Sequence, residues 1–344
     1  MSTKEPKTRH RLSKVAGSII VLAAMTVLGP IPALLATRHE YTWSLFIFLF
    51  PVAVLAIWYL ITPEREIGKF GKAFRYCFIF LFALGAVLDL FWADEFFTFS
   101  NKEAVWLPSI PALDISFRPL AITAASYAIP LEEFIFYGAG FLAMLLIYIW
   151  GDEYFFKRYN DRDYVTEARG DEPLFSFSVP PLVVASLLVA AGFAYKAARG
   201  GGGVPGYLLY LVALPTLLIL LWYPATRRFI NWQAFSFMFL YMLGVGVLWE
   251  VTLAAPDGWW GYQHQSMVGM FVEPWHDLPI EAVMVWFLAA ITTVATFERL
   301  KIFFSNPNKT PRLFGRRRRG DPSQRRASDE RKAPTDMQPS RVTR

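Results

Sequence analysis

The chain has 344 residues, of which 55% are hydrophobic and 18% charged, and its apolar residues recur in long runs. This composition is that of an integral membrane protein rather than a soluble domain. The formal net charge of +6 belongs to the C-terminal tail: residues 305–344 hold twelve Lys/Arg and four Asp/Glu, a balance of +8, so residues 1–304 carry −2. The single cysteine, Cys77, excludes an intrachain disulfide and a cysteine-rich metal site.

In chain order, a polar and basic lead precedes eight apolar segments. Each segment is close to the ~20 residues that cross a bilayer as an α-helix. The expected spans are 14–36, 42–62, 74–92, 131–150, 176–197, 204–223, 233–254 and 280–298. We therefore expect an all-α integral membrane fold with about eight transmembrane helices. No small-residue cleavage pattern follows the first segment, so we expect it to span the membrane rather than act as a cleaved signal peptide.

The distribution of Lys and Arg between the loops predicts the orientation. Loops 62–75 and 151–175 hold four such residues each, whereas loop 93–130 holds two and loop 255–279 holds none. Both termini should therefore be cytoplasmic, with the plasma membrane of a bacterium as the expected location.

The eight spans divide into two halves of four. Leu84-Gly-Ala-Val-Leu-Asp89, which ends the third span, parallels Val245-Gly-Val-Leu-Trp-Glu250, which ends the seventh. Because four is an even number, both copies cross in the same direction, which predicts a parallel repeat. The expected organisation is a cytoplasmic lead (1–13), a first membrane repeat (14–150), a polar linker (151–175), a second membrane repeat (176–304) and a basic disordered tail (305–344). The tail composition favours contact with anionic lipid over nucleic acid.

Acidic residues lie at the starts of the fourth and eighth spans. Pro130-Leu-Glu132-Glu133 opens the fourth span, and Pro279-Ile-Glu281 opens the eighth. Proline at the first helical position and acidic residues in the first turn also fit an ordinary helix start. The apolar run 119–150 is nevertheless too long for one untilted span. We therefore expect Pro130 to break it, with the carboxylates lining a buried cavity rather than facing lipid.

Neighbouring residues on a helix point about 100° apart, so Glu132 and Glu133 cannot both face one partner. The repeat aligns Glu132 with Glu281, and we expect these two to face one cavity across a pseudo-twofold axis. Asp89 and Glu250 are expected to form a second pair near them. Burial disfavours an ionised carboxyl, so at least one of these groups should rest protonated, as a general acid requires.

Aromatic side chains gather in the same outer loops. They fit an interfacial belt, but rings in a buried site would also stabilise a cation. The expected lining residues are Trp92, Trp259, Trp260, Tyr262 and Trp275, with His276 and Asp277 beside them. A hydrogen bond from His276 or Asp277 would tune the acidity of the Glu281 carboxyl. The spacing of these residues and His264 fits no zinc pattern, so no metal is expected.

Several nucleotide and cofactor motifs are missing from the sequence. There is no G-x-G-x-x-G after a strand, no Walker A sequence and no Asp-rich cluster for a magnesium-bound diphosphate. No cofactor is therefore expected.

In these motifs the chain resembles the lycopene cyclase domain family, which includes heterodimer-type bacterial lycopene β-cyclases and the cyclase half of fungal bifunctional enzymes. Pro130-Leu-Glu132-Glu133-Phe-Ile-Phe matches the family's Pro-x-Glu-Glu helix start. Trp249-Glu250, Gly258-Trp-Trp-Gly-Tyr262 and Leu278-Pro-Ile-Glu281 match a second copy. The resemblance covers about residues 42–150 and 204–303.

The chain departs from the family pattern at two motifs. Ala282 replaces the second Glu of the later motif, and the first copy reads Asp94-Glu-Phe-Phe-Thr-Phe99 in place of a Gly-Trp-Gly form. Each half also has one span more than the usual three.

The resemblance implies a role in carotenoid biosynthesis, in which acid catalysis closes the end groups of lycopene to β-ionone rings without a redox change. Glu132 would be the acid, with Glu281 or Glu250 as base or tuning partner and Glu133 and Asp89 in the same site. The partners would be membrane lipid and a hydrophobic polyene. Assembly into a homo-oligomer is a further open alternative. Two alternatives stay open: a terpenoid cyclase or hydratase for another polyene, and a non-catalytic polyene-binding or proton-coupled transport protein.

Overall fold

The computed structural model describes residues 17, 20–61, 66–117, 120–159 and 178–304. Within these residues, seven helices are long and apolar enough to cross a membrane. The expected all-α membrane fold is confirmed, and the chain is a multi-pass membrane protein. Of the expected first span, the structure describes a shorter apolar helical segment, Ile20–Leu35. The predicted lead, most of the linker and the tail lie outside the described residues.

The apolar segments form helices close to the predicted bounds. The helices are α2 (Ile31–Leu35), α3 (Glu40–Ser44), α4 (Phe46–Ile61), α5 (Glu66–Phe96), α6 (Leu131–Trp150), α8 (Val179–Ala198), α9 (Gly206–Thr226), α10 (Trp232–Trp249) and α11 (Ile280–Phe304). Helices α6 and α10 continue into π-helical turns, Gly151–Phe155 and Glu250–Ala254. Such wide turns occur often at functional sites, and the second of them carries Glu250.

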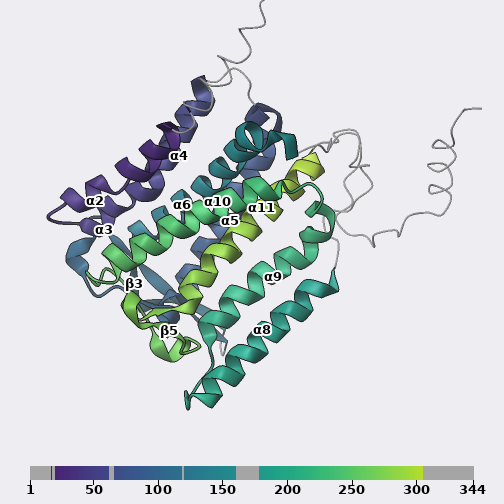
Figure 1. The fold of residues 1–344 in the computed structure, drawn as a ribbon. Coiled ribbons are helices and arrows are strands. Elements are labelled where there is room, and N and C mark those ends of the chain that lie inside the picture. Colours follow the sequence, from purple (N-terminus) through teal and green to yellow (C-terminus); the bar gives the residue numbers. More distant parts are fainter. Residues whose placement is uncertain (1–16, 18–19, 62–65, 118–119, 160–177, 305–344) are drawn as a thin grey trace, which may run out of the picture.

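The helices pack in two similar sets around a central pair, α6 and α11 (Figure 1). Helix α6 contacts α4 and α5 as α11 contacts α9 and α10. The first set is therefore α4, α5 and α6, and the second is α9, α10 and α11. Each central helix also contacts a helix of the other set: α5 packs on α11, and α10 packs on α6. The two sets therefore have matching contacts. The parallel repeat and the four-helix form of each half stay predictions.

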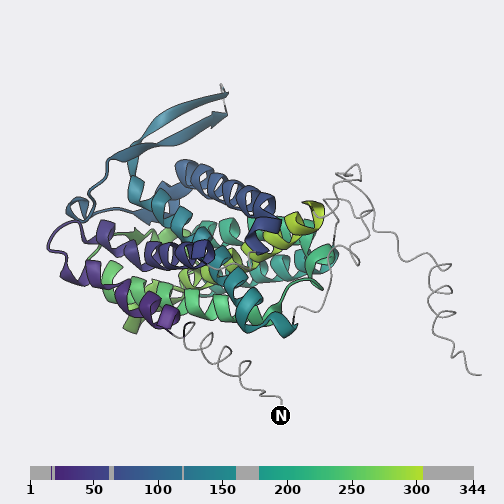
Figure 2. The same cartoon turned by 90° about the horizontal axis from the view of Figure 1, so that it is seen from above.

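The apolar run 119–150 does break at Pro130, but a β-hairpin precedes the helix there. Strand β2 (Ser109–Phe117) pairs with β3 (Leu120–Pro130), and α6 begins at the next residue. Figure 2 shows this hairpin, the pair of blue-teal arrows, projecting from the helical body. The sequence did not predict it.

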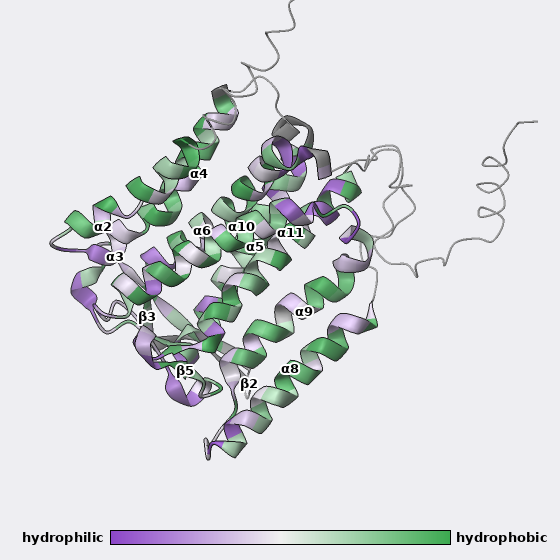
Figure 3. Cartoon of the chain, in the orientation of Figure 1, coloured by the Kyte–Doolittle hydropathy of each residue, from purple (hydrophilic) through white to green (hydrophobic). Residues whose placement is uncertain are grey.

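The second half has a smaller hairpin in the equivalent place. Strand β5 (Phe271–Val272) pairs with β6 (Leu278–Pro279), which again ends at the proline that opens a long helix. The two outer loops also pair directly, since β1 (Phe97–Thr98) lies antiparallel to β4 (Gly261–Tyr262). Figure 3 shows the polar residues gathered in these loops and the apolar ones along the helices. The outer loops therefore hold the two halves together above the helices.

Lys196 near the end of α8 lies beside loop 255–279, which the charge rule predicts to be an outer loop with few basic residues. Lys196 is buried and only 5% exposed. Its Nζ donates hydrogen bonds to the backbone oxygens of Gln265 (2.5 Å) and Met267 (2.8 Å). This lysine anchors the second outer loop to α8.

Candidate functional site

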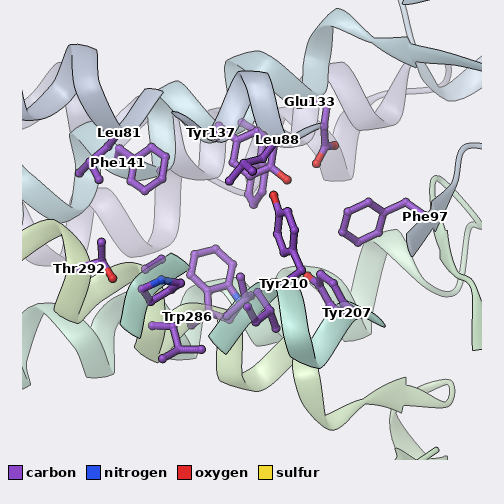
Figure 4. A pocket seen from close by; sticks show the side chains of 18 of the residues that line it. Leu81, Leu88, Phe97, Glu133, Tyr137, Phe141, Tyr207, Tyr210, Trp286 and Thr292 are labelled. Atoms are coloured by element: carbon purple, nitrogen blue, oxygen red, sulfur yellow. The ribbon is translucent and has the colours of Figure 1, made fainter. Parts of the chain in front are cut away.

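An apolar cavity of about 170 Å³ lies between α5, α6, α9 and α11. The lining residues on these helices are Leu81, Leu84, Gly85 and Leu88 on α5, Glu133, Phe136, Tyr137, Gly140, Phe141 and Met144 on α6, Tyr207, Tyr210, Leu211 and Pro215 on α9, and Val285, Trp286, Leu288, Ala289 and Thr292 on α11. Most are three or four residues apart within each helix, so each helix turns one face to the cavity. Rings of the outer loops and of α10 complete the wall, and Figure 4 shows the cavity from close by.

Glu133 faces this cavity from the first turn of α6. Its side chain is buried, with 8% of the residue exposed. Its Oε2 accepts a hydrogen bond of 2.6 Å from the hydroxyl of Tyr41 on α3. Figure 4 shows the carboxyl pointing into the cavity, across from Tyr210. A buried carboxyl in an apolar cavity, held by a phenol behind it, has the placement that a general acid needs.

The hydroxyl of Tyr41 should stabilise the fold through this bond. We expect Tyr41→Phe to lower the free energy of unfolding by about 1–3 kcal/mol, because it leaves a buried carboxyl oxygen without its donor. Thermal unfolding of the purified protein in detergent measures the change. Tyr154→Phe is the matched control, because the Tyr154 hydroxyl is buried and makes no hydrogen bond among the described residues. Equal losses in both variants would contradict the role given to Tyr41.

Glu250 reaches the cavity from the opposite set of helices. It is 5% exposed and stands at the start of the π-helical turn after α10, with Tyr262 and Trp286 beside it. Its charge would interact with that of Glu133. Its Oε2 makes no hydrogen bond among the described residues. Glu250 therefore places a second buried carboxyl in the cavity wall.

Asp89 lies behind the cavity wall rather than in it. The residue is 2% exposed, and its Oδ1 accepts a hydrogen bond of 3.2 Å from the hydroxyl of Tyr137, which does line the cavity. Asp89 is near enough to Glu133 for their charges to interact. The contacts of Asp89 are therefore with Tyr137 and Glu133, and its pairing with Glu250 stays a prediction.

Glu132 points away from the cavity, and the expectation that it faces a cavity with Glu281 is wrong. Its Oε1 accepts hydrogen bonds from the backbone N–H groups of Trp106 and Leu107 (both 2.8 Å) and from the hydroxyl of Thr42 (2.6 Å). The physical reason is the helical phase, which turns Glu132 about 100° from Glu133. Glu132 holds the first outer loop to α6.

Glu281 does the same for the second outer loop. Its Oε1 accepts a hydrogen bond of 2.6 Å from the backbone N–H of Val268, and it does not line the cavity. The adjacent contacts also correspond, because Leu131 donates to the backbone oxygen of Pro108 (3.2 Å) as Ile280 donates to that of Met270 (3.0 Å). The two carboxyls that the sequence aligns therefore make the same kind of contact, and each clamps a loop.

The expected aromatic residues divide into two groups. Trp260 and Tyr262 line the cavity, and Trp259 is buried beside Tyr41 with ring centroids 6.0 Å apart. Trp92 and Trp275 are 40% and 39% exposed and do not line the cavity, so for them an interfacial belt is the better interpretation.

His276 and Asp277 also lie away from the cavity. Both are exposed and have positive φ angles of 53° and 54°, which form a tight turn before β6. Among the described residues, neither makes a hydrogen bond to Glu281, whose Oε1 accepts from the backbone N–H of Val268. Among the described residues there is no group of three or more His, Cys, Asp or Glu that could hold a metal ion.

Tyr262 brings a phenol to the wall beside Glu250. Burial and the neighbouring Glu250 charge raise the pKa of Tyr262 well above its usual value. Burial likewise raises the pKa of Tyr127, whose hydroxyl donates to the backbone oxygen of Phe97 (3.1 Å). Both phenols stay neutral in the physiological range, so Tyr262 lines the cavity without adding charge.

Several residues of the site were not predicted from the sequence. Tyr41, Tyr137, Tyr207, Tyr210, Trp249 and Trp286 all line the cavity or contact its carboxyls. The helical spacing of Glu133, Tyr137, Gly140, Phe141 and Met144 held a signal, because it places these residues on one face of α6. That Tyr41 reaches Glu133 from 92 residues away had no local signal.

Comparison of the chain with models of known protein families, with curated proteins and with solved structures gives no match.

Proposed function

We propose that this protein cyclises the end groups of an acyclic polyene by acid–base catalysis, with lycopene as the substrate that the motif resemblance favours. One observation carries the proposal: the buried carboxyl of Glu133 faces an apolar cavity walled by aromatic rings. An apolar cavity selects a hydrocarbon ligand. In a bound polyene, the group that a carboxylic acid can protonate is a carbon–carbon double bond.

Glu133 replaces Glu132 as the proposed acid, because the Glu133 carboxyl lines the cavity. Its proton adds to the terminal double bond and leaves a tertiary cation. The electrons of a neighbouring double bond then close the ring and move the cation onto the ring. Glu250 takes a proton from the adjacent ring carbon, which restores a double bond. Proton gain and loss balance, so the reaction needs no electron acceptor.

The aromatic wall supports the cationic stage of this reaction. The face of a Trp or Tyr ring attracts a cation, by about 2 kcal/mol or more when water is excluded. Trp249, Trp260 and Trp286 stand around Glu250, and the ring centroids of Trp249 and Trp260 are 4.6 Å apart. The same apolar wall keeps water from trapping the cation, which favours a cyclase over a hydratase.

The size of the cavity suits one end group. An engineered protein cavity of about 150 Å³ admits benzene, and the cavity here is of similar volume, about 170 Å³. We propose that one ring-forming end enters at a time. We also propose, from the loop charges, that both termini are cytoplasmic in a bacterial plasma membrane.

Expression in a bacterium that accumulates lycopene tests the proposal. We expect chromatography of the pigments to show monocyclic or bicyclic products in cells with the protein and intact lycopene in cells without it. Lycopene left intact, with the protein present in the membrane, would contradict the assignment of this substrate. A product from another polyene would then support the wider terpenoid enzyme, and bound but unchanged polyene would support the binding or transport alternative.

A further inference from the structure

Helices α5 and α9 stand side by side at the cavity but make little contact with each other. Both pack closely on α11, which lies behind them. Each turns a face of lining residues to the cavity, including Leu84 and Leu88 on α5 and Leu211 on α9. The space between the two helices is therefore a sparsely packed part of the wall.

Aromatic contacts close this space at both ends. Phe96 of α5 lies 5.1 Å, between ring centroids, from Tyr207 and from Tyr210 of α9. Phe80 of α5 lies 5.7 Å from Trp222 of α9. Sixteen residues of helix separate Phe80 from Phe96, which is roughly 24 Å at 1.5 Å per residue. We call the region between these contacts the α5–α9 slot, bounded by Phe80, Phe96, Tyr207 and Trp222.

The residues beside the slot face outward. Val87 on α5 is 48% exposed and Leu217 on α9 is 50% exposed. Because both helices are candidate membrane spans, this face meets the hydrocarbon of the bilayer. Pro215, which lines the cavity within α9, has no N–H to continue the helical hydrogen bonds, so the helix can bend there.

The corresponding region in the other set of helices, between α4 and α10, is filled. Phe48 of α4 packs against Trp249 of α10, with ring centroids 5.1 Å apart, and is stacked on Trp286 of α11 at 5.8 Å. Phe48 is only 1% exposed. The two halves therefore differ: among the described residues, a buried ring fills the space between α4 and α10, whereas residues of α5 and α9 line the cavity.

We infer that a long hydrocarbon chain enters the cavity sideways from the bilayer through the α5–α9 slot, and that the part of the chain beyond the reacting end stays in the lipid. This inference rests on the proposed function for the identity of the chain. The cavity volume supports it, since a ring-sized space holds an end group and excludes a whole carotenoid. Each ring would then need its own binding event, so the monocyclic product should be released and bound again.

Photolabelling tests the entry route without relying on catalysis. The probe is a long-chain hydrocarbon carrying a diazirine, dissolved in phosphatidylcholine vesicles that hold the purified full chain. We expect label on Leu84, Leu88 and Leu211, located by fragmentation mass spectrometry, and suppression of that label by added lycopene. Label on Val87, which faces lipid, should persist. Label in the cavity confined to the α4–α10 side, or slot label that lycopene does not suppress, would overturn the inference.

A matched pair of variants connects the slot to turnover. Leu84→Trp narrows the slot where it meets the cavity, whereas Ile79→Trp adds the same ring at a lipid-facing position of α5 that is 59% exposed. We expect the rate of ring formation to fall at least ~10-fold in Leu84→Trp, because the indole takes space that the end group needs, and to change less than ~2-fold in Ile79→Trp. Equal rates in both would overturn the entry route. Slot label that lycopene suppresses, without ring formation by the unmodified protein, would retain the route and contradict the proposed function.

Discussion

Glu133→Gln should abolish ring formation while the protein still folds and reaches the membrane. An amide cannot donate the proton that starts the reaction, and loss of a general acid lowers rates by roughly 10²–10⁴-fold. The amide oxygen can still accept the hydrogen bond from Tyr41, so the fold should survive. The measurement is the pigment profile of lycopene-accumulating cells at matched protein level.

Glu132→Gln is the matched control for this loss. The amide oxygen can still accept the hydrogen bonds of Trp106, Leu107 and Thr42, and residue 132 does not line the cavity. We therefore expect Glu132→Gln to keep most of the product. Loss of product in Glu132→Gln with activity retained in Glu133→Gln would reverse the assignment of the acid.

Gly246→Ala should destabilise the protein and distort the cavity. A Cβ at position 246 of α10 would overlap the indole of Trp286, which lines the cavity. The indole cannot move away easily because it is stacked on Phe48, with 5.8 Å between ring centroids, and Phe136 lies edge-on at 6.1 Å. Overpacking of this kind costs about 1–3 kcal/mol. Thermal unfolding in detergent and the pigment profile should both register the change.

Gly244→Ala on the same helix provides the control. A Cβ at position 244 would meet nothing within 4 Å. Alanine also favours a helix over glycine by about 1 kcal/mol, so this variant should be as stable as the unmodified protein or more so. A loss of stability in Gly244→Ala equal to that in Gly246→Ala would show that the effect comes from the helix backbone and not from Trp286.

The apolar runs predicted seven of the membrane helices and the break at Pro130, because length and composition decide whether a segment can cross a bilayer. The hairpin before α6 was not predicted. Its strands, Ser109–Phe117 and Leu120–Pro130, are apolar like the neighbouring helices, and a short apolar run does not distinguish a strand from a helix.

The acidic motif was located from the sequence, but its two carboxyls were given the wrong orientation. The alignment of Glu132 with Glu281 drew attention to the pair that the two halves share. That pair clamps the outer loops, a structural need that both halves have. The cavity carboxyl is Glu133, for which the second half has Ala282, so the difference between the halves held the better functional signal.

Deuterium incorporation tests the central claim most directly. The purified protein is placed in lipid vesicles that contain lycopene, in D₂O buffer without added reductant. If Glu133 protonates the terminal double bond, mass spectrometry should find one retained deuterium for each ring, because the proton lost at the end comes from a different carbon. Rings that carry no deuterium after many turnovers would contradict protonation by an exchangeable carboxyl, and so would recovery of unchanged lycopene alone.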